Sequence, residues 1–422
     1  MIPPATSFAR QQDACSPAPA LRVLILTAGF GEGHNAAARN LAEAFNLTPA
    51  RSAAHVVDLF ALASPRLNAV TRRGYLSLIN RAPKIWSAFY RWIDRSQLLP
   101  GGLWMLARET RLLARLIAQR QPDIICSTYP AYGFMLERLA RQGRLAVPYF
   151  TIVTDSISIN SLWWRPACDG WFVPNADSAA VLRSVGLDDR RVHDCGFPTP
   201  AFIVDHARLA PPDLTAGGRP RLLYIINSGT HQALETARRL LAETNWEITC
   251  AVGRDENLRG QLERLVARRP VPAAILGWTD EIPRLLLTHH VVISKAGGAT
   301  TQEAIAARCP MIVNQIVPGQ EEGNYELLRR HGIGALAQTP GAVVSACRRA
   351  FADRGALWHK WRTALAPLSR PDASRDIADR ILAEARKKKF PAPVPVSVAF
   401  PTRLRSLPDG GRTSAAPDTL PV

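Results

Sequence analysis

The chain has 422 residues, with 52 Lys and Arg against 35 Asp and Glu, and a formal net charge of +17. This length favours two domains, and a hydrophobic content of 47% excludes a largely disordered chain. No apolar run is long enough for a transmembrane helix, and the N-terminus lacks the pattern of a signal peptide. The excess of positive charge indicates an anionic partner, such as nucleic acid, an acidic membrane surface or a phosphorylated ligand.

The seven cysteines are scattered, odd in number and without a C-x-x-C pair. This pattern argues against a zinc ribbon or a disulfide framework and favours reduced thiols. We therefore expect a cytosolic protein.

The N-terminal half alternates predicted strands with predicted helices. An apolar run at 21–28 is typical of a buried parallel strand, and Asn35 can cap an Ala-rich helix that runs to about Phe45. Further strands are predicted at 55–58, 124–126, 149–153 and 171–173, with helices at 103–119, 133–142 and 177–184. This alternation predicts a doubly wound α/β domain.

The loop after the first predicted strand contains Gly29, Gly31 and Gly33, and His34 follows. Glycines let backbone N–H groups approach a phosphate, and a helix N-terminus favours an anion. The dinucleotide fingerprint G-x-G-x-x-G fits at two glycines, with His34 at the third position and Asp58 where a ribose-binding acid would lie. A nicotinamide enzyme is therefore one alternative, and a loop histidine without a chemical role is another. A histidine at a helix N-terminus that faces a cleft can instead act as a base.

Residues 66–120 carry eleven Lys or Arg, only two acids and six aromatic side chains. This composition is expected at a membrane surface, where each Lys or Arg near an anionic leaflet contributes about 1 kcal/mol. The candidate membrane residues are Arg91, Arg95, Arg108, Trp86, Trp92 and Trp104. A solvated helical face is the plain alternative. We expect no nucleic-acid partner, because no recognition motif accompanies the charge.

After a Pro- and Gly-rich linker the alternation begins again. Strands are predicted at 221–226, 247–252, 273–276, 291–294 and 311–314, with helices at 230–241 and 373–386. Two Rossmann-like domains are thus expected to face each other across a cleft, where ligands normally bind. The expected divisions are a disordered segment at 1–20, an N-terminal domain at 21–207, a linker at 208–220, a C-terminal domain at 221–370, a helix at 371–389 and a disordered Pro-rich tail at 390–422.

A second glycine turn follows the predicted strand at 291–294. Residues 297–300 read Gly-Gly-Ala-Thr and open a helix that carries Glu303. This turn would present N–H and hydroxyl donors to a diphosphate, and Glu303 could accept from both hydroxyls of a ribose. The stretch 318–324 then offers amides and carboxylates suited to sugar hydroxyls. The order and spacing of the glycine turn, Glu303 and the stretch 318–324 together indicate a nucleotide-sugar site.

In these motifs the sequence resembles the diacylglycerol glycosyltransferases, namely plant monogalactosyldiacylglycerol synthases and bacterial processive diacylglycerol glucosyltransferases. It resembles the peptidoglycan lipid glucosaminyltransferase more distantly. The resemblance covers about residues 21–345. Its specific parts are residues 31–37, 153–155 with Trp163, 297–300 with Glu303, and 318–324. It implies the α/β GT-B fold and a peripheral enzyme on the cytoplasmic side of the membrane. That enzyme would transfer a hexose from a UDP-sugar to a lipid, with diacylglycerol as the first candidate, inverting the anomeric centre without a catalytic metal or other cofactor.

The resemblance also implies roles for individual residues. The catalytic residues would be His34, as the base that takes the acceptor proton, and Asp155. The donor would be held by Gly229, Trp278, Gly297, Gly298, Ala299, Thr300, Glu303, Gln320, Glu321 and Asn324. Within this set, Gln320 and Glu321 would hold the sugar hydroxyls. The acceptor loop would include Gly31, Gly33, Tyr129 and Asn160. N–H donors at helix ends, rather than a cation, would stabilise the leaving UDP.

The sequence departs from the family at three places. Asn160 stands where the family usually has a histidine, Tyr129 stands at a second such position, and the glycine turn after 221–226 is reduced. Two of these departures concern the acceptor half. Two further alternatives therefore stay open. One is a non-catalytic or regulatory GT-B-like protein that binds lipid or nucleotide, and the other is an epimerase or a transferase with a non-lipid acceptor.

Overall fold

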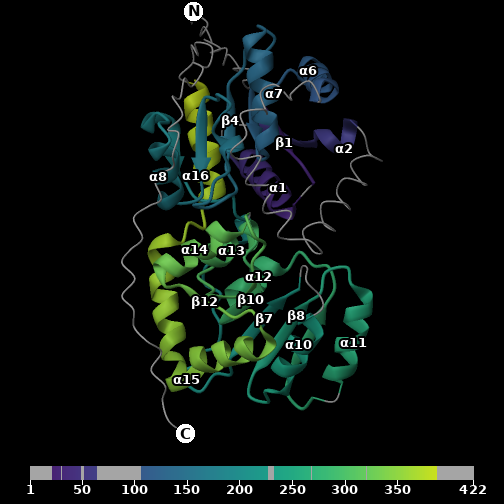
Figure 1. The fold of residues 1–422 in the computed structure, drawn as a ribbon, viewed down its shortest axis with the longest axis vertical. Coiled ribbons are helices and arrows are strands. Elements are labelled where there is room, and N and C mark those ends of the chain that lie inside the picture. The colour runs from purple at the N-terminus through teal and green to yellow at the C-terminus, as the bar shows by residue number, and fades with distance from the viewer. Residues whose placement is uncertain are drawn as a thin grey trace, which may run out of the picture.

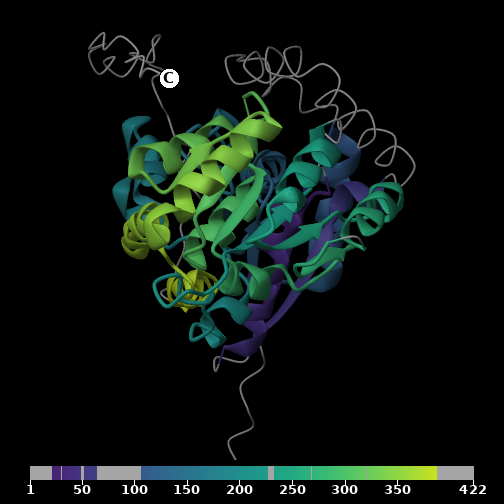
Figure 2. The same ribbon diagram turned by 90° about the horizontal axis from the view of Figure 1, so that it is seen from below.

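The computed structural model describes residues 21–29, 31–48, 52–63, 106–226, 232–267, 269–319 and 321–386. They form two parallel sheets of six strands each, and each sheet is covered by helices. In Figure 1 the green C-terminal domain lies below the purple and blue N-terminal domain. From below, in Figure 2, the C-terminal domain lies in front. The predicted pair of Rossmann-like α/β domains is confirmed.

The N-terminal sheet has the strand order β2-β1-β3-β4-β5-β6. Its strands are β1 (Leu21–Thr27), β2 (Ser52–Asp58), β3 (Ile124–Ser127), β4 (Tyr149–Ile152), β5 (Gly170–Val173) and β6 (Val192–Asp194). Its helices are α1 (Glu32–Leu47), α2 (Leu59–Ala63), α6 (Ala107–Arg120), α7 (Pro130–Arg141), α8 (Ala176–Ser184) and α9 (Ala201–Asp205). The chain leaves β1 for β2 and then crosses back to β3, so the strand order reverses between β1 and β3.

The C-terminal sheet has the strand order β12-β11-β10-β7-β8-β9. Its strands are β7 (Arg221–Ile225), β8 (Glu247–Ala251), β9 (Ala273–Leu276), β10 (Val291–Lys295), β11 (Met311–Gln315) and β12 (Gly334–Leu336). The helices are α10 (Ala233–Ala242), α11 (Glu256–Val266), α12 (Ile282–Thr288), α13 (Gly298–Ala306), α14 (Glu322–His331), α15 (Pro340–Leu365) and α16 (Ala373–Arg386). Here the order reverses between β7 and β10.

The last helix, α16, returns to the N-terminal domain and packs on α1 (Figure 1). Ile377 and Ile381 are buried in one apolar cluster with Leu41 and Phe45 of α1. Burial of these side chains therefore stabilises the packing of α16, the last described helix, on the N-terminal domain.

One local prediction was wrong. Helix α1 begins at Glu32, with Gly31 as an extended N-cap residue and no side-chain capping bond. Asn35 lies inside the helix, and its Oδ1 accepts a hydrogen bond of 3.0 Å from Thr27 Oγ1. Asn35 therefore ties α1 to the end of β1 rather than capping the helix.

Candidate functional site

The two predicted glycine turns lie at the points where the strand order of each sheet reverses. The first follows β1 and opens α1, and the second follows β10 and opens α13. A Cβ atom on Gly33 would lie 3.7 Å from the backbone N of Ala299, and one on Gly298 would lie 3.1 Å from the carbonyl O of Thr154. The starts of both helices therefore meet across the domain boundary. Crevices at such reversal points are the usual ligand sites of α/β sheets.

His34 lies in the first turn of α1, at this junction. Its Nδ1 is 3.0 Å from Thr154 Oγ1, and its ring meets the edge of Tyr129 with 5.1 Å between ring centroids. Thr128 Oγ1 donates to the carbonyl O of His34 at 3.1 Å. Burial lowers the pKa of His34 to about 4, so the ring is neutral at physiological pH. An unprotonated imidazole fixed at Nδ1 is suited to accept a proton at Nε2.

Asp155 belongs to the loop that follows β4 and reaches the same junction. Trp163 Nε1 donates to Asp155 Oδ2 at 2.7 Å, and the Trp163 ring lies 5.9 Å from that of His34. Burial raises the pKa of Asp155 to about 6, against the smaller opposing effect of the indole bond. The structure thus brings His34, Asp155 and Tyr129 together. It also gives Thr154, whose role we had not predicted, a direct bond to the imidazole.

The two residues that replace family histidines have different surroundings. Asn160 Oδ1 accepts from the backbone N of Leu162 at 3.0 Å and caps a short 3₁₀ helix (Ser161–Trp163), while its buried Nδ2 has no hydrogen-bond partner. Tyr129 packs edge-on against both His34 and Phe60. Tyr129 therefore contacts the candidate base directly, whereas Asn160 shapes the loop.

The second glycine turn, residues 297–300, opens α13 without a side-chain cap. We call it the donor turn, because the sequence predicts that it binds the donor. Gly297 is the extended N-cap residue and provides no side-chain capping bond to the N–H groups of the first helical turn. Such a helix start favours an anion, because free N–H groups and the helix dipole both point toward it. Residues Gly298, Ala299 and Thr300 are only partly buried, so a ligand can reach this turn.

Glu303 lies farther along α13. Its carboxyl group is partly buried, and among the described residues it has no hydrogen-bond or ion-pair partner. Burial raises its pKa to about 7, and the positive charge of Arg39 on α1 opposes this effect. A carboxyl group without a protein partner beside a phosphate-type turn is suited to accept hydroxyl groups.

Two other predicted donor residues form bonds within the protein. Glu321 contacts Lys295 Nζ through Oε1 and accepts from the backbone N of Val317 through Oε2 at 3.0 Å. Asn324 Nδ2 donates to the carbonyl O of Ala296 at 2.9 Å, and its buried Oδ1 has no partner.

The remaining donor predictions are less closely placed. Trp278 follows β9 and exposes 68% of its surface. It lies at the same strand-end edge of the sheet as the donor turn. Gln320 and Gly229 lie outside the described residues.

Asp58 argues against the nicotinamide alternative. Its Oδ2 accepts from the backbone N of Gly29 at 2.8 Å, and its Oδ1 accepts from the backbone N of Ala61 at 2.9 Å. One oxygen holds the backbone of the loop after β1, and the other holds the backbone of the first turn of α2. The carboxylate is therefore committed to the loop rather than presented to a ribose.

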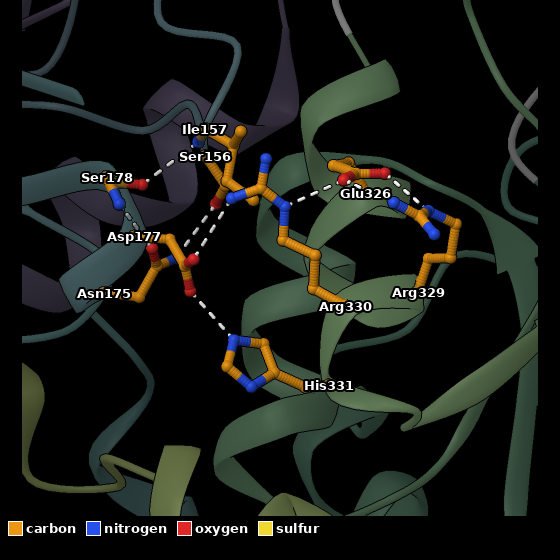
Figure 3. A network of polar contacts seen from close by, with 9 residues as sticks. All are labelled: Ser156, Ile157, Asn175, Asp177, Ser178, Glu326, Arg329, Arg330 and His331. Carbon is orange, nitrogen blue, oxygen red and sulfur yellow. Dashed lines mark hydrogen bonds and ion pairs between the residues drawn. The ribbon is translucent and has the colours of Figure 1, made fainter. Parts of the chain in front are cut away.

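Polar contacts across the domain boundary were not predicted from the sequence (Figure 3). Asp177 on α8 accepts from Arg330 Nη1 at 3.3 Å and lies 2.8 Å from His331 Nε2, both on α14. Gln302 Nε2 of α13 donates to Ser156 Oγ at 2.8 Å. A Cβ atom on Gly323 would lie 1.9 Å from the carbonyl O of Ser156. Only glycine permits this approach, so the first turn of α14 lies directly against the loop after β4.

Most of the predicted membrane residues lie outside the described part of the chain, namely Arg91, Arg95, Trp86, Trp92 and Trp104. Arg108 is described. It is exposed on α6 together with Arg111 and Arg115, while Leu113 is buried beneath them. Within the described ranges, no helix has the length and apolarity to cross a membrane, and no group of three or more His, Cys, Asp or Glu is arranged to hold a metal ion.

Comparisons with known proteins agree with this arrangement. A family model for monogalactosyldiacylglycerol (MGDG) synthase matches residues 34–199. A processive diacylglycerol beta-glucosyltransferase of Bacillus mycoides is 24% identical over 390 residues, which cover 89% of this chain and 97% of the relative. A Bacillus cereus protein of the same name is 24% identical over 376 residues, which cover 86% and 94%.

Solved structures share the fold. A UDP complex of MnaA from S. aureus has a TM-score of 0.58 at 14% identity, covering 88% of this chain and 98% of that chain. The glycosyltransferase SnogD from Streptomyces nogalater has a TM-score of 0.53 at 17% identity, covering 86% and 100%. A UDP-GlcNAc 2-epimerase from Neisseria meningitidis has a TM-score of 0.53 at 12% identity, covering 86% and 100%. The expected GT-B fold is confirmed. Because these proteins include both a transferase and an epimerase, the fold does not decide between the two activities.

Proposed function

We propose that the chain is a diacylglycerol glycosyltransferase, which transfers a hexose from a UDP-sugar to the hydroxyl group of diacylglycerol. One observation carries the proposal. The uncapped start of α13 and the neutral imidazole of His34 meet at one junction between the domains. One side therefore offers a site for a diphosphate, and the other offers a base for an acceptor hydroxyl.

The chemistry follows from these positions. As the acceptor oxygen attacks C1 of the hexose, its proton passes to His34 Nε2, while Thr154 holds Nδ1. The pKa of His34 is about 4 in the protein alone, and the charge of a bound diphosphate would raise it. The helix start at α13 stabilises the charge on the departing UDP. Attack from the side opposite the leaving group inverts the configuration at C1.

We assign the reaction to the cytoplasmic face of an anionic membrane, without a metal or other cofactor. The support is the exposed cationic face of α6, formed by Arg108, Arg111 and Arg115, and the larger basic and aromatic segment 66–120 that ends in this helix. Cations at the surface of an anionic leaflet would hold the N-terminal domain beside its lipid acceptor.

The experiment is a product analysis. The purified full chain is incubated with radiolabelled UDP-glucose, UDP-galactose or UDP-N-acetylglucosamine and with anionic vesicles that contain diacylglycerol. We expect label in the lipid phase with at least one donor, and at least about 100-fold slower labelling with His34→Ala. Vesicles without diacylglycerol are the matched control.

Other outcomes separate the alternatives. Nucleotide binding without transfer or hydrolysis would contradict the proposal and support a binding protein. Conversion of UDP-N-acetylglucosamine to another UDP-sugar without acceptor would support an epimerase.

A further inference from the structure

Lys295 and Glu321 join the ends of two neighbouring strands in the C-terminal domain. Lys295 is the last residue of β10, and Glu321 follows β11 and precedes α14. Lys295 Nζ binds Glu321 Oε1, and the side chain of Glu321 is only 7% exposed. The second oxygen of Glu321 accepts from the backbone N of Val317 at 3.0 Å. This carboxylate is therefore fully used in orienting the lysine and its own loop.

The ammonium group lies beside the donor turn. A Cβ atom on Gly297 would lie 3.9 Å from Lys295 Nζ and 3.8 Å from Glu321 Oε1. Both are ordinary contact distances, so the ion pair lies directly beside the turn that opens α13. The cation and the uncapped N–H groups of α13 therefore belong to one small region.

Lys295 also keeps donors for a ligand. An ammonium group has three N–H donors, and among the described residues Glu321 is the only partner of this one. The side chain is 26% exposed and lines a polar cavity at the carboxyl ends of β7, β10, β11 and β12. Asn314, Gln315 and Gln338 line the same cavity. The ammonium is therefore oriented but not enclosed.

We propose that Lys295 donates to the β-phosphate of the bound donor and that Glu321 is the residue that positions it. This inference rests on the proposed function and deepens it. When the bond between C1 and the β-phosphate oxygen breaks, its electron pair stays on that oxygen. Lys295 keeps its protons and stabilises the new charge through a charge-assisted hydrogen bond. Lys295 would then supply a cation that backbone N–H groups alone do not provide. Glu321 would act through Lys295 rather than on the sugar hydroxyls.

The test compares the binding of UDP and UMP, which differ by the β-phosphate. Lys295→Gln should weaken UDP binding by roughly 10- to 100-fold, the range of a lost charged hydrogen bond, and change UMP binding little. Isothermal calorimetry on the full chain measures both. Lys360→Gln, an exposed change on α15, is the matched control and should leave the UDP-to-UMP affinity ratio unchanged. Lys295→Arg keeps the charge and should retain most of the ratio.

Each other outcome has a definite meaning. An unchanged affinity ratio in a folded Lys295→Gln protein would overturn the proposal and leave the ion pair a structural one. Wild-type protein that binds neither nucleotide would instead overturn the proposed function. If Lys295→Gln fails to fold, Glu321→Gln provides a second test. It leaves the ammonium but weakens its anchor, so UDP affinity should fall with UMP affinity unchanged, and an equal fall for both ligands would contradict the assignment.

Discussion

Among single residues, His34 is the one on which the proposed transfer depends most. Replacing it with alanine removes the proton acceptor but no donor contact, so turnover should fall by about 10²- to 10⁴-fold, the usual contribution of general base catalysis. The affinity for UDP should stay nearly constant. Initial rates and calorimetry measure the two quantities separately. Turnover within a few-fold of wild type would show that His34 is not the base.

Glu303 provides a pH-dependent prediction. Its pKa is raised to about 7, so the carboxyl group is ionised above that pH and protonated below it. An ionised carboxylate accepts more strongly from ribose hydroxyls, so uridine affinity should fall as the pH drops from 8 to 6. Uridine is the suitable probe, because it has no phosphate that titrates in this range. Glu303→Gln should flatten the profile, measured by competition or ligand-observed NMR. If uridine affinity changes with pH equally in the wild type and in Glu303→Gln, Glu303 does not bind the ribose.

Much of the candidate site could be predicted from residue types and spacing, because glycine turns before helices have direct consequences for the backbone. The contacts of each individual side chain could not be predicted in this way. Glu321 was expected to face sugar hydroxyls, yet both of its oxygens are bonded to Lys295 and Val317. The pairing joins Lys295 at the end of β10 to Glu321 in the loop after β11, and no local sequence pattern predicts a contact between residues 26 positions apart.

At the scale of elements, the packing of α16 on α1 makes a stability prediction. Ile381 is fully buried in the cluster with Leu41 and Phe45. Ile381→Ala leaves a cavity and should lower the free energy of unfolding of the N-terminal domain by about 2–5 kcal/mol. Urea denaturation measures the change.

The exposed face of the same helix supplies the control. Asp379→Ala on α16 should change the stability by less than about 0.5 kcal/mol. Equal effects of the two substitutions would show that the helix does not stabilise the domain by burial.

Element prediction succeeded where a strand is a run of large apolar residues and failed where that run or the helical period is interrupted. The apolar run of β1 identified a buried strand, but the three residues of β6 and the three of β12 do not form such a run. Helix α15 was not predicted. Its backbone leaves the helical region at Ala352–Gly355, where Asp353 and Arg354 have positive φ angles, so a single periodicity does not run through it.

For the molecule as a whole, the net charge of +17 supports the proposed contact with an anionic membrane. Arg108 and Arg115 are exposed on α6. Reversing both to Glu should weaken binding to anionic vesicles by more than about tenfold, because each cation near such a surface contributes about 1 kcal/mol. The difference should shrink at high salt.

Sedimentation with vesicles at two salt concentrations measures this effect. Arg264→Glu with Lys360→Glu, two exposed changes in the C-terminal domain, is the matched control for net charge. Equal losses in the two double variants would mean that the total charge, and not this face of α6, determines membrane binding.

Hexose transfer with inversion can be followed by proton NMR of a single reaction mixture. The mixture contains the full chain, an α-linked UDP-hexose and diacylglycerol in anionic micelles. We expect the donor's anomeric signal to decay while a β-linked glycolipid signal grows at the same rate, with both changes at least about 100-fold slower for His34→Ala. An α-linked product, free hexose alone, or a new UDP-sugar would contradict inverting transfer to the lipid.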